Sequence, residues 1–136
     1  IMVNKHQQGQ GCPICNESKL ETEISKFLDD NEIEYERQKK FEWLCNIKNM
    51  SLDFYLPKYN IAIECQGEQH FRPIDYFGGK DEYDIICNRD KIKYNLCKEH
   101  DLNIFYFSSK EFGNIDYLGN IYCDKERLLE EITKLQ

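Results

Sequence analysis

Two acidic residues, Asp53 and Glu64, have the spacing best suited to chemistry in this sequence. They lie in two alternating apolar segments, residues 52–56 and 61–65, which are separated by a turn sequence at residues 57–60. A closed four-residue loop would place the two carboxylates directly opposite each other, with Cβ atoms about 5 Å apart. Two like charges at that distance destabilise a sheet unless a cation neutralises them. Mg²⁺ or Mn²⁺ suits such a pair, because it binds carboxylate oxygens and leaves positions for phosphate and water.

Alternation along this hairpin assigns its residues to two faces. The apolar residues at 52, 54 and 56 are expected to face the core, whereas Asp53, Glu64 and Gln66 are expected to face the other side of the sheet. A one-residue shift in register is the alternative, and it would leave both carboxylates as solvated surface residues.

The elements that must position these residues form an α/β pattern. Helices are expected at residues 19–30 and 81–100 and from Asp124 onward, strands at 33–44, 52–56, 61–65, 103–107 and 118–123, and a long loop at 66–80. This order predicts an αβββαβ core with a mixed central sheet flanked by helices. Residues 18–136 are expected to form one domain, and the polar residues 1–17 a tail or a partial zinc-knuckle-like segment.

Composition narrows the class of protein. The chain has 136 residues, of which 40% are hydrophobic, and this is enough to build a core and excludes intrinsic disorder. It has neither a long apolar run nor the pattern of a signal peptide, and its seven cysteines are scattered and odd in number. We therefore expect no membrane partner and a cytoplasmic location. The net charge of −7 disfavours nucleic-acid binding by bulk charge, but not through metal-neutralised carboxylates.

The order of these motifs resembles the PD-(D/E)XK nuclease superfamily. The resemblance rests on a helix that carries Glu21, on Asp53 within Leu-Asp-Phe-Tyr-Leu-Pro, and on Glu64-Cys-Gln66 at the end of the next strand, before a further helix. Residues 67–71 (Gly-Glu-Gln-His-Phe), 77–79 (Phe-Gly-Gly) and 89–94 extend it over nearly the whole chain. They resemble more closely phage and large-virus proteins related to the very-short-patch-repair and EDxHD homing endonucleases.

This resemblance implies a restriction-endonuclease-like core and metal-dependent hydrolysis of DNA phosphodiester bonds, in the host cell if the protein is viral. By position, Asp53 and Glu64 would hold Mg²⁺ or Mn²⁺, and Glu21 would orient a water or help to bind a second ion. Gln66 stands where the superfamily has Lys, so it can position a water or phosphate without supplying a charge. His70 would accept a proton from the attacking water.

Two positions stay open under this resemblance. Lys91 or Lys93 would replace the missing Lys, and Lys93 is favoured because it lies one turn from Asp90. The related homing enzymes are described by a His–Asp pair, and either Asp75 or Asp90 would be the partner of His70.

Each candidate also has a plainer interpretation. Glu21 is spaced as the last residue of a capping box that begins at Ser18, and Gln66 can be a polar residue at a strand end. His70 can be a loop histidine bonded to backbone. For Asp90 and Lys93 we favour the plain interpretation, a surface pair on one helix.

The N-terminal segment offers three ligands with zinc-knuckle spacing, His6, Cys12 and Cys15. One ligand is missing, and the resembling viral proteins carry this segment as the end of a repeat whose other ligands lie upstream. Zinc binding and two free thiols are the alternatives. The other cysteines are expected to be small core residues.

The sequence thus predicts a magnesium-dependent DNA endonuclease. The alternatives are a catalytically inactive nuclease-like fold that binds nucleic acid or a protein partner, and a zinc-organised binding module. The sequence leaves the oligomeric state open, with a homodimer as one option. Basic residues flanking the carboxylate face are expected to contact phosphates or to serve solubility: Arg37, Lys39, Lys40, Lys58, Arg72 and Lys80.

Overall fold

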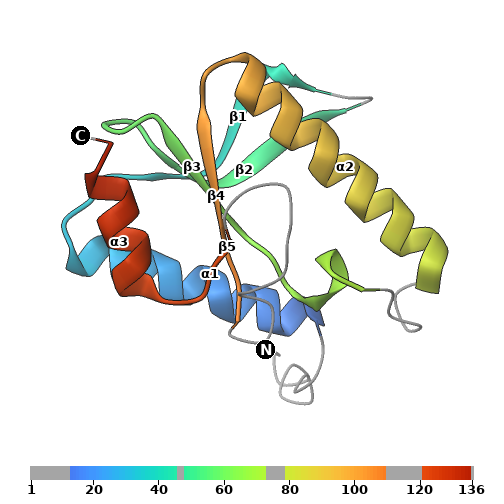
Figure 1. The fold of residues 1–136 in the computed structure, drawn as a ribbon, viewed down its shortest axis with the longest axis horizontal. Helices are drawn as coiled ribbons and strands as arrows, with labels where there is room; N and C mark the ends of the chain where they lie inside the picture. The colour runs from blue at the N-terminus through green and yellow to red at the C-terminus, as the bar shows by residue number, and fades with distance from the viewer. Residues whose placement is uncertain (1–12, 46–47, 73–78, 110–120, 136) are drawn as a thin grey trace, which may run out of the picture.

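A five-stranded mixed sheet organises the chain (Figure 1). The computed structural model describes residues 13–45, 48–72, 79–109 and 121–135. The strands lie side by side in chain order: β1 (Glu36–Cys45), β2 (Asn49–Leu56), β3 (Ile61–Cys65), β4 (Asn103–Phe107) and β5 (Ile121–Tyr122). β1, β2 and β3 are antiparallel to one another, and β4 and β5 run parallel to β3. The predicted α/β class, with a mixed sheet flanked by helices, is confirmed.

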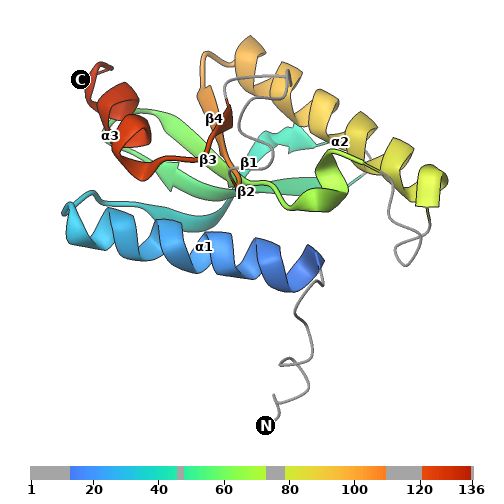
Figure 2. The same cartoon turned by 60° about the horizontal axis from the view of Figure 1, so that its bottom comes forward.

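Helices cover both faces of this sheet. The helices are α1 (Pro13–Asp30), α2 (Gly79–Glu99) and α3 (Lys125–Thr133), with a short 3₁₀ helix, η2 (Glu68–His70), after β3. Figure 2 shows α1 and α2 on opposite sides of the sheet. Leu28 of α1 and Leu128 of α3 share one buried cluster, whereas Cys97 of α2 belongs to another. The sheet therefore separates two apolar cores.

α1 begins earlier than predicted. Its first residue is Pro13, whose fixed φ and missing N–H suit the first turn of a helix. Ser18 and Glu21 consequently lie inside the helix, so the predicted capping box is wrong. The helix also crosses the boundary that was predicted between residues 17 and 18. By contrast, Asp124 caps α3 as expected, because its side chain accepts a hydrogen bond from the N–H of Glu126 at 3.0 Å.

The β2–β3 hairpin has the predicted register. Phe54 pairs with Ile63 and Leu56 with Ile61, so positions 53 and 64 come next along the ladder. The turn closes because the carbonyl of Leu56 accepts hydrogen bonds from the N–H groups of Tyr59 and Asn60, and Asn60 takes a left-handed φ of 55°. Asn is among the few residues that adopt this conformation at low cost.

One part of the predicted facing is wrong. Phe54 lies in the cluster under α1 and α3, but Leu52 lies in the cluster under α2. The change of face occurs at Asp53, and Gln38, which stands between the β1 partners of Leu52 and Phe54, has a left-handed φ of 51°. The change of face in β2 therefore coincides with a backbone irregularity in β1, opposite Asp53.

Within the described ranges, the helices are too short or too polar to cross a lipid bilayer.

Candidate active site

The two acidic residues of the hairpin are interlocked with the backbone. Asp53 Oδ2 accepts a hydrogen bond from the N–H of Cys65 at 2.9 Å, and Glu64 Oε2 accepts one from the N–H of Asp53 at 2.6 Å. The backbone ladder between β2 and β3 ends at the pair of Phe54 and Ile63, and these side-chain bonds continue the connection beyond it. The two carboxylates are thus neighbours, as predicted, and they are held in place by the strands themselves.

Proximity and burial make the charge on Asp53 costly. Burial is the main cause that raises the pKa of Asp53 to about 8, and the adjacent Glu64 raises it further. The hydrogen bond from Cys65 and the charge of Lys93 act in the opposite direction, whereas Glu21 adds to the increase. A nearby cation would stabilise the charged form of this carboxyl group. The electrostatics at Asp53 therefore favour the binding of a positive ion.

Lys93 of α2 supplies part of the required positive charge. Its Nζ donates to Glu64 Oε1 at 2.7 Å and to the carbonyl of Ser51 at 2.8 Å. Burial by itself would lower the pKa of Lys93, but Glu64, Asp53 and Asp90 outweigh it and raise the pKa above its ordinary value. Lys93 therefore stays charged beside the carboxylates, in the position favoured from the sequence as the substitute for the missing Lys.

His70 forms a pair with Asp90, 2.8 Å from Nδ1 to Oδ2. η2 places His70 just after β3, and α2 presents Asp90, which is buried. Our preferred interpretation of Asp90 and Lys93 as a surface pair is wrong, because each binds a residue of the β3 region instead. The other candidate partner, Asp75, lies outside the described residues. No spacing in the sequence indicates a contact between positions 70 and 90, since it depends on how α2 crosses the sheet.

Gln66 is the first residue after β3 and lies two positions after Glu64. Its N–H donates to the carbonyl of Phe107 at 2.9 Å, and Ser108 Oγ donates to its carbonyl at 2.6 Å. The residue is only 2% exposed, yet its side-chain amide makes no hydrogen bond with any other described residue. Buried amides are normally satisfied, so this group is available to a water or ligand.

Glu21 lies at the edge of this group. It projects from α1, and its Oε1 accepts a hydrogen bond from Arg37 of β1 at 2.7 Å. Its charge also acts on Asp53, as described above. Glu21 therefore acts on the carboxylate pair through its charge, while its own carboxylate is bound by Arg37.

The donor set fits a hard divalent ion bound mainly by two carboxylates. Oδ1 of Asp53 makes no hydrogen bond with the described residues, and Glu64 is 5% exposed beside it. In the part of the chain that the structure describes, no group of three or more His, Cys, Asp or Glu side chains is arranged to hold a metal. Mg²⁺ in proteins is commonly bound by only one or two carboxylates and completes its shell with water and substrate phosphate.

Two of the three predicted zinc ligands lie outside the residues that the structure describes. His6 and Cys12 lie outside the described residues, and Cys15 lies in the first turns of α1, with a side chain outside the description. Among the described cysteines, Cys65 and Cys97 are buried as expected, whereas Cys87 and Cys123 are half-buried and Cys45 is exposed, so the core prediction is wrong for Cys45.

Most of the basic residues expected to contact phosphates are engaged within the protein. Arg37 binds Glu21, Lys39 binds Glu36, Arg72 binds Glu68 and Lys80 binds Asp84. Lys58 lies over the ring of Tyr59 at the far end of the hairpin. Lys40 is exposed on β1.

No protein-family model matches this chain, nor does any curated protein or solved structure. Its function is therefore inferred from the side chains themselves.

Proposed function

We propose that the protein is a metal-dependent endonuclease of the PD-(D/E)XK type that hydrolyses phosphodiester bonds in DNA. The observation that carries this proposal is the interlocked pair of Asp53 and Glu64, with the Lys93 ammonium 2.7 Å from Glu64. Two adjacent acidic groups and a half-buried lysine on the neighbouring helix match the acid, acid and lysine roles of that superfamily, although here the lysine comes from α2 rather than from β3.

Asp53 and Glu64 would hold the ion. When bound, Mg²⁺ or Mn²⁺ supplies positive charge to a phosphate oxygen and makes a coordinated water more acidic. Lys93 would fix the orientation of Glu64 and balance its charge. Gln66 has a buried amide that can donate to a phosphate oxygen or a water at this end of β3.

His70 is the proposed proton acceptor. Its contact with Asp90 orients the ring through Nδ1, and a neutral ring with the proton on Nδ1 has its basic lone pair on Nε2. Asp90 acts through His70 and is a positioning residue. Such a pair can receive the proton released when water attacks phosphorus.

A nicking assay on supercoiled DNA tests the proposal. The wild type should convert supercoiled plasmid to open circles in Mg²⁺ or Mn²⁺ and should lose this activity in EDTA. Asp53→Asn keeps the shape of the side chain but removes its charge, so we expect at least a 100-fold loss, on the order of effects for central charged groups. Asp30→Asn, an exposed change of the same kind on α1, is the matched control and should cleave as the wild type does.

A catalytically inactive nuclease-like fold is the second candidate. It is favoured by the fact that both oxygens of Glu64 already accept hydrogen bonds, from Lys93 and from the N–H of Asp53. If the wild type binds DNA but does not nick it with any divalent ion, this second function replaces the first.

A further inference from the structure

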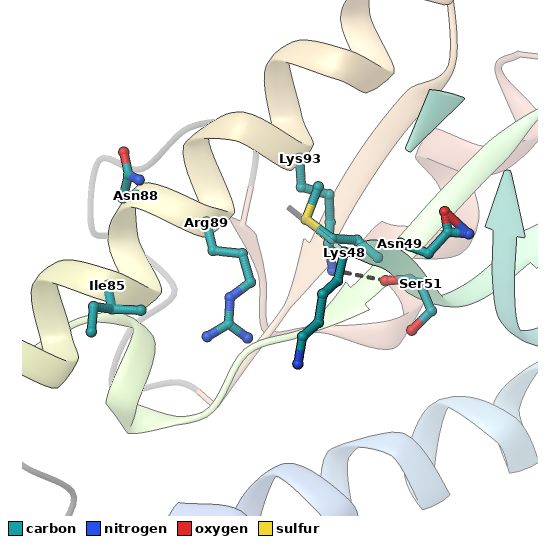
Figure 3. Close-up of a pocket in the computed structure, with 8 residues that line it drawn as sticks. Lys48, Asn49, Ser51, Ile85, Asn88, Arg89 and Lys93 are labelled. Carbon is teal, nitrogen blue, oxygen red and sulfur yellow. Dashed lines mark hydrogen bonds between the residues drawn. The ribbon is translucent and has the colours of Figure 1, made fainter. Parts of the chain in front are cut away.

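A pocket beside the carboxylates is formed by two segments far apart in the sequence. It has a volume of about 700 Å³. The start of β2 and the residue before it form one wall, and residues 85–93 of α2 form the other (Figure 3). The lining residues are Lys48, Asn49, Met50, Ser51, Ile85, Asn88, Arg89 and Lys93.

The charge of this pocket is opposite to that of the whole protein. The chain carries a net charge of −7, yet three of the lining residues are cations and none is an acid. Lys93 is bound to Glu64, but Lys48 and Arg89 form no ion pair or hydrogen bond with any described residue. Figure 3 shows the two side chains coming from opposite walls, with their charged ends pointing the same way.

Arg89 is exceptional among the arginines. The other three, Arg37, Arg72 and Arg127, each pair with a glutamate of the protein. Arg89 is exposed and faces Lys48 across the pocket instead of an acid. Two like charges on facing walls repel each other, and an anion between them would remove that repulsion.

The pocket is continuous with the candidate active site. Lys93 lines the pocket and also binds Glu64, and its second bond goes to the carbonyl of Ser51, two residues before Asp53. An anion held by Lys48 and Arg89 would therefore lie next to the carboxylates rather than on a remote surface.

Neutral groups in the pocket add a second kind of contact. Asn49 and Asn88 are polar residues that line the pocket on its two walls, and Ile85, which is 54% exposed, offers apolar surface. Cations combined with amides and an apolar contact suit a phosphate that carries a sugar and a base.

We propose that this pocket binds one backbone phosphate and its nucleoside, in the nucleic-acid strand that enters the carboxylate site. Lys48 and Arg89 contact the phosphate, and the base lies toward Ile85 and Asn88. This proposal rests on the proposed function. It assigns a binding site to a nucleotide of the substrate strand other than the one whose phosphodiester bond is cut.

The first test locates binding without cleavage. The ¹⁵N-labelled wild type is titrated in EDTA with a short DNA duplex, with the single strand, and with inorganic phosphate. We expect the duplex or the strand to shift the amide signals of residues 48–51 and 85–89. Shifts confined to other surfaces, no binding at low salt, or shifts produced by inorganic phosphate alone would overturn the proposal.

The second test removes the two charges. Lys48→Gln/Arg89→Gln should weaken binding at low salt by at least tenfold and lower the salt dependence of log K by about 1, the value for one phosphate contact. The matched control is Lys19→Gln/Lys26→Gln, which removes two exposed charges from α1. Both double variants should keep the wild-type Tm, since all four side chains are exposed.

The outcomes separate this inference from the proposed function. If the wild type cleaves DNA and the pocket variant binds and cleaves as the control does, the pocket proposal fails and the nuclease stands. If the wild type binds DNA through residues 48–51 and 85–89 but never cleaves it, the pocket proposal stands and the nuclease fails.

Discussion

At the scale of single residues, the site combines two carboxylates that repel each other with one lysine that balances them. Asp53 shows the cost most clearly, because burial and Glu64 raise its pKa to about 8. Groups with strongly shifted pKa values are common at functional sites, since function requires charges where stability alone would avoid them.

This shift predicts how stability depends on pH. The pKa of Asp53 is raised on folding, from 3.8 to about 8, so the folded state binds its proton more tightly than the unfolded state. The stabilising contribution is therefore complete below the unfolded value and is lost as the pH rises toward about 8. Asp53→Asn removes this loss. In EDTA near pH 8, the free energy of unfolding of Asp53→Asn should exceed that of the wild type by about 1–2 kcal/mol, so the variant should unfold at a higher urea concentration. Near pH 4 the two proteins should differ little.

Urea unfolding curves at several pH values measure this effect. Asp30→Asn serves again as control and should follow the wild-type curve. A wild type whose stability relative to Asp53→Asn does not fall between these pH values would contradict the assigned environment of Asp53.

Lys93 predicts a second effect on stability. Lys93→Met leaves Glu64 buried beside Asp53 without its cation, so we expect a loss of about 2–4 kcal/mol. The double variant Lys93→Met/Glu64→Gln should recover part of that loss, because no uncompensated charge remains. A double-mutant cycle by urea unfolding gives the coupling energy, and Lys91→Met, exposed on the same helix, is the control. Additive effects would mean that the ion pair does not form in solution.

The His70–Asp90 pair predicts a fixed tautomer. In the neutral ring, the contact with Asp90 should keep the proton on Nδ1. ¹⁵N spectra of the imidazole should therefore show one tautomer in the wild type and a mixture in Asp90→Ala. A mixture already present in the wild type would remove the basis for assigning a positioning role to Asp90.

At the scale of elements, the hairpin turn sets the register on which the site depends. Asn60 has a φ of 55°, accepts a hydrogen bond from Tyr55 and donates one to the carbonyl of Asp101. Asn60→Gly keeps access to this conformation, whereas Asn60→Ala does not.

We therefore expect Asn60→Ala to be less stable than Asn60→Gly by about 1 kcal/mol, although both lose the same side-chain bonds. Thermal unfolding of the two variants measures the difference. Equal stability would show that the left-handed turn is absent in solution.

α2 has a different role, because it joins the site to the pocket. Its second half packs on the sheet through Cys97, and its first half extends toward η2 with Ile85 exposed (Figure 1). One helix thus carries Asp90 toward His70, Lys93 toward Glu64 and Arg89 toward the pocket.

At the scale of the whole molecule, a net charge of −7 opposes the approach of DNA, so the proposed DNA binding should depend on the proposed metal ion. A ligand that binds only the folded state stabilises it, by about 2.7 kcal/mol at a concentration 100 times its Kd. Mn²⁺ should therefore raise the Tm of the wild type but not that of Asp53→Asn, and calorimetric titration should give heat of binding only for the wild type. An equal rise in both proteins would place the ion at another site.

The sequence by itself determined the element order, the hairpin register and the closeness of Asp53 and Glu64. These depend on local information: alternation of apolar residues, a turn of fixed length and a short distance along the chain. The same local rules explain why Asp124 was found as a helix cap.

Only the tertiary structure decided the partners of those acids. Leu52 packs on the other face from Phe54, and this change lies opposite the left-handed Gln38 of β1, a neighbour that the sequence of β2 does not encode. The contacts of Lys93 with Glu64 and of His70 with Asp90 join residues that the chain separates by whole elements, and Lys48 lines one pocket with Arg89 in the same way. Such contacts follow from how α2 crosses the sheet, and no local spacing encodes that crossing.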